Sequence, residues 1–443
     1  MSDLVLLFYI LFSIGTILIG YKAYGRWINH ITIYSFVWGT QIVLFEVRLI
    51  NYANLTVETT TYIFGAWVIF IIASLTFRTF YPAIVPAGTG LKLKYNENAV
   101  AGLLVFLIFI GAAATYQHWT ILIRAFGSVQ KAIINGNIIY TMTRKGGFPG
   151  EWKYLDSASM AASFLGGYYI AAKGRFPLLG ILPLLTEFAE SLTSFGRGDF
   201  IVTTVLWGTG YFVALHRAKA KDPHALRRHL VVLTSIGLIF VVAVELIQIV
   251  RTSSKSSFTA EPSALSHTKG IGGLIGPSLY LYLSSDVAVL NVFLNYNFKG
   301  DIEHQTFGAN TLAPEYRMLS KLGLTDYPPQ YEKAYVVPVF TNTGTFLREL
   351  YDDWGLVGSL IVVYLIGALC SITYETFQRK GSIVSLAVLA HLYVIVFWSF
   401  DVMATRWGNW VSSFILATIA GAIADGWARR RPRSTAELPL VER

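Results

Sequence analysis

An arginine stands in a very short polar turn between two apolar segments of the chain. The turn reads Gly196-Arg197-Gly198-Asp199, and its glycines let the backbone turn and let a ligand approach closely. A guanidinium is a planar fork of hydrogen-bond donors that suits a diphosphate. Arg197 is therefore a candidate for binding an anionic group. In the alternative interpretation it caps the end of a helical bundle and pairs with Asp199.

Two glutamates precede this turn at i and i+3, a spacing that places Glu187 and Glu190 on one face of a helix. In one interpretation they neutralise Arg197. In the other, one of them is a general base whose pKa is raised by burial, and Glu190 is our candidate for that role.

A largely polar segment, residues 251–350, interrupts the apolar chain and leads into a late apolar segment. If its end is helical, polar residues recur at i, i+3, i+7 and i+10 and form one stripe. Asp353 and Tyr351 follow, where the helix enters the membrane interface. The alternative is that Asn342 and Asp353 cap a helix and Tyr351 is an interfacial aromatic. The stripe consists of Asn342, Thr345, Glu349 and Asp352.

The same segment holds further charged and titratable candidates. Arg348 and Arg317 either bind a second anionic group or are solvated. His267 and His304 have an unperturbed pKa suited to taking a proton from a hydroxyl group near neutral pH, with exposed loop histidines as the alternative. They lack metal-ligand spacing, and no HExxH, GxSxG or P-loop motif occurs. We therefore expect no metal, no cofactor, and neither a serine-hydrolase nor a nucleotide mechanism.

Composition identifies the elements that must position these residues. Hydrophobic residues make up 54% of the 443 and charged residues 14%, and the mean hydropathy is +0.52. A soluble domain carries about a quarter charged residues, so the chain is expected to be an integral membrane protein. The net charge is +9, and the basic residues lie in short loops and at the C-terminus. This distribution indicates orientation in the membrane rather than nucleic-acid binding. The one cysteine, Cys370, excludes disulfides within the chain.

The apolar segments predict an all-α polytopic membrane protein with about 11 transmembrane helices, because each is long enough for one helical crossing. We expect the first segment to be retained as a span rather than removed as a signal peptide. The expected spans are 4–20, 30–47, 59–77, 98–116, 154–172, 176–194, 199–216, 230–250, 354–374, 382–400 and 408–426.

Basic residues orient these spans. The basic loop clusters all fall on one side if the N-terminus is outside and the C-terminus is cytoplasmic. Five loops then share the outer face: 51–58, 118–153, the Gly196–Asp199 turn, the long insert and 401–406. We expect 271–290 to form an interfacial helix rather than another span, and 118–134 to form a helix on the outer surface. The predicted regions are an N-terminal bundle (1–250), an extracytoplasmic loop domain (251–350), C-terminal spans (351–427) and a cytoplasmic tail (428–443).

Three segments together resemble the Wzy-type oligosaccharide repeat-unit polymerases. They are the Gly-Arg-Gly turn, Phe307-Gly-Ala-Asn-Thr-Leu-Ala-Pro314, and the run from Thr341 to Gly358 that opens a late span. The family pattern is a Ser-Arg-Gly turn, a loop with Phe-Gly and Thr-x-x-Pro, then Asn-x-x-Thr, an aromatic-rich helix and Asp-x-Gly. Here Gly196 replaces the serine, and Trp354 stands between Asp353 and Gly355.

This resemblance implies a GT-C-like helical bundle with a large extracytoplasmic loop. It also implies a metal-independent glycosyltransferase that polymerises undecaprenyl-diphosphate-linked repeat units at the outer face of the bacterial inner membrane. The expected partners are the lipid-linked donor and acceptor, the bilayer and a polysaccharide chain-length regulator. By this resemblance, Arg197 is expected to bind the diphosphate. His304 is the preferred general base, and Glu190 is the second candidate. The site prediction comprises Arg197, His304, Glu190 and Asp353 as catalytic residues, and Arg348, Asn342, Thr345, Tyr351, Arg317, Asp199 and His267 as substrate-binding residues.

Two alternatives remain open from the sequence. A lipid-linked polysaccharide flippase or exporter would also be basic and multispanning, although related halves are expected there and no internal repeat occurs in this chain. An O-antigen ligase would differ only in its acceptor.

Overall fold

The fold is built almost entirely from helices. In the computed structural model, a single short hairpin accompanies them within the described part of the chain: β1 (Tyr335–Val336) pairs antiparallel with β2 (Phe340–Thr341). The structure describes residues 3–84, 96–144, 147–218, 231, 234–235, 277–298, 305–326, 328, 333–338, 340–341 and 343–430.

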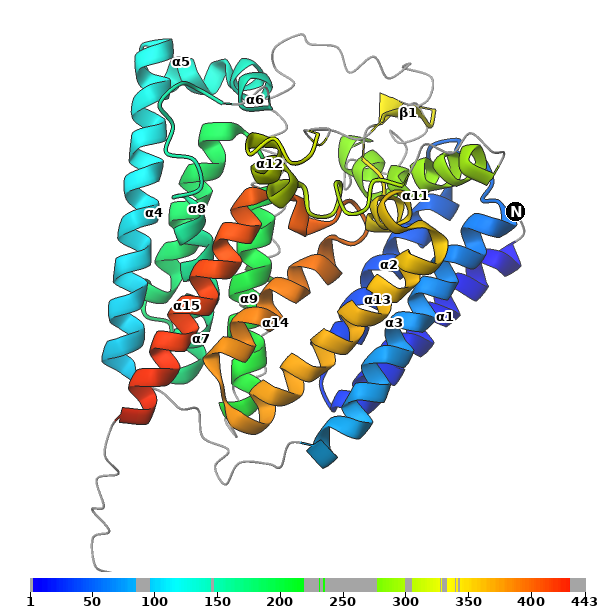
Figure 1. Cartoon of the computed structure of the whole chain (residues 1–443), viewed down its shortest axis with the longest axis horizontal. Helices are drawn as coiled ribbons and strands as arrows, with labels where there is room; N and C mark the ends of the chain where they lie inside the picture. Colours follow the sequence, from blue (N-terminus) through cyan, green and yellow to red (C-terminus); the bar gives the residue numbers. More distant parts are fainter. Residues whose placement is uncertain are drawn as a thin grey trace, which may run out of the picture.

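Long apolar helices pack side by side as a bundle (Figure 1). They are α1 (Asp3–Tyr24), α2 (His30–Val47), α3 (Val57–Ile84), α4 (Glu97–Phe126), α7 (Ser157–Lys173), α8 (Leu178–Ser194), α9 (Gly198–Ala218), α13 (Phe346–Lys380), α14 (Ile383–Trp398) and α15 (Gly408–Arg430).

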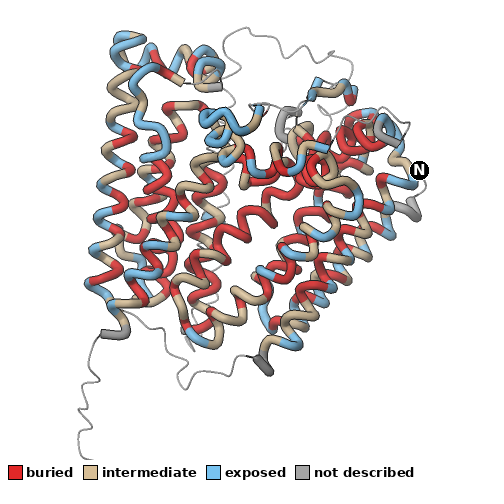
Figure 2. Tube along the Cα trace, in the orientation of Figure 1, coloured by how far each residue is buried: buried red, intermediate tan, exposed pale blue. Residues whose placement is uncertain are grey.

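These helices coincide with the predicted apolar segments, apart from 230–250, most of which lies outside the described residues. In the part of the chain that the structure describes, six are long and apolar enough to cross a membrane: α1, α3, α4, α9, α13 and α15. Large apolar side chains such as Phe109 and Ile72 are exposed on the periphery, while the bundle interior is buried (Figure 2). The chain is therefore a helical membrane protein.

Shorter elements gather at one end of the bundle, at the top of Figure 1. They are α5 (Val129–Ile134), α6 (Gly136–Arg144), α11 (Pro277–Phe298), α12 (Ala313–Lys321), the hairpin, and the 3-10 turn η2 (Ala404–Arg406). Basic residues near the helix ends lie at the opposite end, where Arg217 donates to the carbonyls of Phe377 and Gln378 and Arg78 faces Glu375. The polar loops and these basic residues are thus separated between the two ends.

Helix α11 is fastened across the ends of α2 and α3 by polar contacts with the loop that joins them. The amide of Leu49 donates to the hydroxyl of Tyr280 at 3.1 Å. Asn291 accepts from the amide of Thr56 at 2.9 Å and donates to the carbonyl of Asn54 at 3.0 Å. The described part of the insert therefore lies directly against the transmembrane bundle.

The prediction for 118–134 was wrong over its first half. Helix α4 continues through His118 to Phe126, and only α5 and α6 turn aside. The stop comes at Gly127, whose left-handed conformation lets its amide donate to the carbonyl of Ile123. His118 is therefore held on a long rigid helix.

The predicted boundary at residue 350, between the loop domain and the C-terminal spans, falls inside a helix. Helix α13 begins at Phe346 and runs across it.

Helices α7 and α9 form a close backbone contact at the centre of the bundle. A Cβ atom on Gly167 would collide with the carbonyl oxygen of Trp207, and one on Gly210 with that of Phe164. Small residues let helix backbones approach where packing, rather than water exclusion, drives association. This pair supports the two helix ends that carry Asp156 and Asp199.

Candidate functional site

The arginine turn, residues Gly196–Asp199, joins α8 to α9 at the end of the bundle covered by the insert. Its geometry differs from the prediction, because the left-handed residue is Phe195 (φ 50°) rather than either glycine. Phe195 is buried beneath α5 and α6, packed with Leu122 and Ile139. Such strain in a non-glycine residue is tolerated where surrounding packing fixes it, and it recurs at functional sites.

Arg197 is half-buried, and its Nε atom is fully covered. It acts electrostatically on the hydroxyl of Tyr282 in α11, which donates to Oδ2 of Asp401 at 2.8 Å. The predicted turn arginine therefore lies near both the insert and the loop before α15. Asp401 and Tyr282 were not among the predicted site residues.

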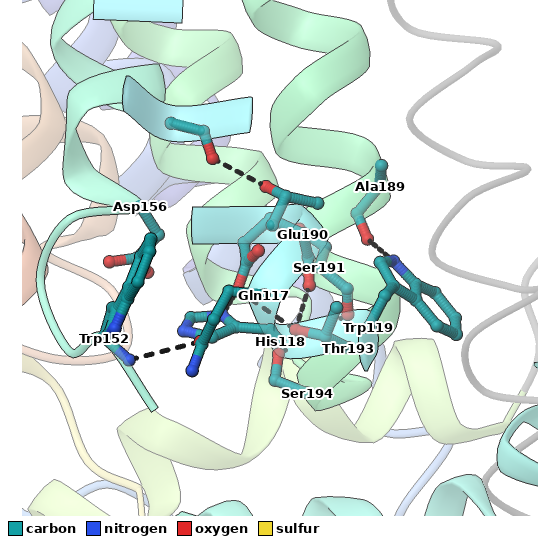
Figure 3. A network of polar contacts seen from close by, with 12 residues as sticks. Gln117, His118, Trp119, Trp152, Asp156, Ala189, Glu190, Ser191, Thr193 and Ser194 are labelled. Carbon is teal, nitrogen blue, oxygen red and sulfur yellow. Dashed lines mark hydrogen bonds and ion pairs between the residues drawn. The ribbon is translucent and has the colours of Figure 1, made fainter. Parts of the chain in front are cut away.

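Four carboxylates meet beside this turn, and we call them the carboxylate cluster: Asp156, Glu187, Glu190 and Asp199. Electrostatic interactions connect all four. They come from the turn before α7, from α8 and from the first turn of α9. His118 joins them from α4 (Figure 3).

Glu190 has the most complete set of contacts in the cluster. Its Oε1 atom lies 2.6 Å from Nδ1 of His118 and accepts from the hydroxyl of Thr193 at 3.0 Å (Figure 3). Asp156 accepts from the side-chain amide of Asn409 at 2.9 Å. The result is a buried acid–histidine pair whose acid stands on the helix that leads into the arginine turn, and such a pair is suited to moving a proton.

Burial and charge repulsion both act on Asp156. Desolvation, followed by the fields of Glu190 and Asp199, raises the pKa of its carboxyl to about 7. Within the described residues, several buried polar atoms here have no hydrogen-bond partner: Oδ1 of Asp156, both oxygens of Glu187, Oε2 of Glu190 and Nε2 of His118.

The two loop segments that carry the family resemblance contact each other. The Asp353 carboxylate accepts from the amides of Asn310 and Thr311 at 3.0 and 2.7 Å, and from the hydroxyl of Thr306. Asp353 therefore fixes the turn that contains Phe307, rather than capping a helix. Its catalytic role stays a prediction.

Helix α13 breaks directly after this contact. Gly355 has φ 67° and ψ −173°, a region that is essentially restricted to glycine. A Cβ atom there would lie 2.6 Å from Nε2 of Gln305, so the break and the turn fit against each other.

The predicted polar stripe does not exist as one helical face. Thr345 precedes the first residue of α13, and Asn342 lies outside the described residues. Glu349 is fully buried and forms an ion pair with Arg406 of η2, while its other oxygen accepts from the amide of Met403. Asp352 accepts from the side-chain amide of Asn310 at 2.6 Å. Tertiary contacts thus direct these side chains to different partners.

Two predicted binding residues are engaged in packing. The Arg348 guanidinium lies over the rings of Phe293 and Tyr335 and donates to the carbonyl of Lys333 at 2.6 Å. Tyr351 packs edge-on against Tyr62 and Phe293. Arg317 is half-buried on α12, which packs against η2.

His267 and His304 lie outside the described residues, and the role of His304 as preferred base stays a prediction. Sequence reasoning missed His118, Asp156 and Arg406. All three are polar residues at the ends of apolar segments, and this position was the signal that could have identified them. Among the residues that the structure places, no three His, Cys, Asp or Glu side chains form a metal-binding group.

No protein-family model, curated protein or solved structure matches this chain.

Proposed function

We propose that this chain is a metal-independent glycosyltransferase that polymerises undecaprenyl-diphosphate-linked oligosaccharide repeat units into a surface polysaccharide. One observation carries the proposal: the turn with Arg197 directly follows the helix that holds Glu190 of a buried acid–histidine pair, at the end of an apolar helical bundle that a polar insert covers. The contact of Asp353 with the turn around Phe307 gives further support, because it joins two segments of the resemblance.

In the proposed reaction, Arg197 stabilises the charge that develops on the diphosphate leaving group. Glu190, oriented by His118, takes the proton of an acceptor hydroxyl. That oxygen bonds to the anomeric carbon of the donor while the carbon–oxygen bond to the diphosphate breaks, and undecaprenyl diphosphate leaves with the electron pair. Direct displacement inverts the anomeric carbon. His304 remains a second candidate base.

The proposal includes eleven spans in a GT-C-like bundle of the bacterial inner membrane. The N-terminus and the insert face the exterior, and the C-terminus faces the cytoplasm. Donor and acceptor are both lipid-linked, and a chain-length regulator is a further expected partner. The apolar periphery supports contact with lipid tails, and the polar end supports a site for sugars.

Reconstitution tests this proposal. The full-length protein in liposomes is given a panel of synthetic undecaprenyl-diphosphate oligosaccharides, and products are separated by length. Wild type should form a ladder of longer glycans. Arg197→Ala should reduce ladder formation about a hundredfold or more, because removing one preorganised donor to a developing anion has effects of that size.

The matched control is Arg175→Ala, an exposed arginine at the opposite end of the bundle, which should retain the ladder. Lipid translocation without any ladder would contradict the polymerase and favour a flippase. Transfer of one preformed glycan to a different acceptor would favour a ligase.

A further inference from the structure

Glu187 is the most completely buried acid of the carboxylate cluster. Its exposed fraction is 0%, and neither carboxyl oxygen has a hydrogen-bond partner among the residues the structure places. The acidic groups acting on it are Asp199, Asp156 and Glu190. The carboxyl group of Glu187 is therefore buried, lacks a hydrogen-bond donor among these residues, and lies within the electric field of three other acids.

The charges around Glu187 are mainly of its own sign. Asp199 comes from α9, Asp156 from the turn before α7, and Glu190 from the next turn of α8. On α4, the one titratable group of the cluster is His118, and its Nδ1 atom is engaged by Glu190. Arg197, in the turn between α8 and α9, acts on Tyr282 of α11.

An ionised Glu187 would be strongly unfavourable in this environment. An unpaired buried charge costs several kcal/mol, and such a group normally becomes neutral instead. Two oxygens without a donor would add the cost of unmet hydrogen bonds. A proton removes the charge without needing ligands from several side chains, and the described residues contain no set of three with metal-ligand arrangement.

We propose that the carboxylate cluster is a proton-binding site in which Glu187 holds a proton at neutral pH. The site follows from burial, from the unpartnered oxygens and from the mutual proximity of the four acids. It does not depend on the identity of the substrate.

Its role in turnover does rest on the proposed function. With Glu187 neutral, one less negative charge lies beside Glu190, the acid that is hydrogen-bonded to His118. In the proposed reaction, Glu190 is the group that takes the acceptor proton. Glu187 is in this sense a positioning residue, because its proton lowers the negative charge around the proposed base without any contact to the substrate.

Infrared spectroscopy of the full-length protein in lipid tests the site directly. A protonated carboxyl has a carbonyl stretch that a carboxylate lacks. At pH 7 the wild type should show this band, and Glu187→Gln should lose the intensity of one carboxyl. The control Glu58→Gln changes an exposed acid at the same end of the bundle and should leave the band unchanged. Equal band intensity in wild type and Glu187→Gln would overturn the proposal.

Two further measurements keep the test decisive if Glu187→Gln does not fold. In wild type labelled with ¹³C only in glutamate, part of the protonated-carboxyl band should shift, while the contribution of Asp156 stays in place. A band without a shifted component would overturn the assignment. Addition of Na⁺, K⁺, Mg²⁺ or Ca²⁺ should leave the band unchanged, whereas its loss would show that a metal cation replaces the proton. None of these readouts requires polymerisation, so failure of the proposed function and failure of this inference are distinguishable.

Discussion

Single residues near the arginine turn give the protein a specific pH dependence. Asp156 has an ordinary pKa of 3.8 and a pKa of about 7 in the fold. Between these values the folded state keeps the proton while the unfolded state has lost it. The contribution of Asp156 to folding stability must therefore fall as pH rises from about 4 to 7 and change little above that range.

Asp156→Asn should remove the share of this slope that comes from Asp156, because asparagine is neutral throughout and still offers an oxygen to Asn409. The expected gain in unfolding free energy at pH 7 is on the order of a few kcal/mol, since one pKa unit corresponds to about 1.4 kcal/mol. Unfolding in detergent at several pH values between 4 and 8 measures it. Asp326→Asn, at an exposed position of the insert, should follow wild type. Parallel curves for Asp156→Asn and wild type would contradict the assignment.

At the scale of the elements, the close contact of α7 and α9 can be tested with two glycine substitutions on the same helix, one of which is the control. Gly210→Ala places a methyl group against the carbonyl of Phe164, whereas Gly208→Ala, on the same helix, meets open space. Overpacking of this kind costs about 1 to 3 kcal/mol. Gly210→Ala should therefore lower the melting temperature in detergent, and Gly208→Ala should not. Equal melting temperatures for the two variants would show that the helices can separate without loss.

Element positions were predictable because apolar runs in a membrane protein have one stable local structure, and the bonds of each helix close within the run itself. The place of Arg197 in a turn between two helices was predictable because it depends only on residues next to it in the sequence. Glu349 and Asp352 were misassigned because Arg406 and Asn310, far away in the sequence, decide where these side chains point. His118 was misplaced because its helix continues to Phe126, nearly three turns beyond the predicted span.

The whole molecule has one polar, covered end and one basic end, and this asymmetry can be tested across a membrane. The natural Cys370 is buried, so it should not react and need not be removed. Glu315→Cys on α12 and Glu58→Cys at the start of α3 should react with an impermeant maleimide added outside intact cells. Arg175→Cys and Lys22→Cys, exposed at the other end, should react only after permeabilisation. Labelling in the reverse order would invert the proposed orientation.

The break in α13 at Gly355 has a mechanical consequence for this arrangement. A membrane helix adapts to bilayer thickness by tilting. If α13 were continuous, each change of tilt would pull on Glu349 and Asp353, which fasten its first turns to η2 and to the turn around Phe307. Because the helix is broken at Gly355, the segment after Gly355 can follow the bilayer while the segment with Glu349 and Asp353 stays fixed. Gly355 thereby isolates the covered end of the molecule from the thickness of the membrane around it.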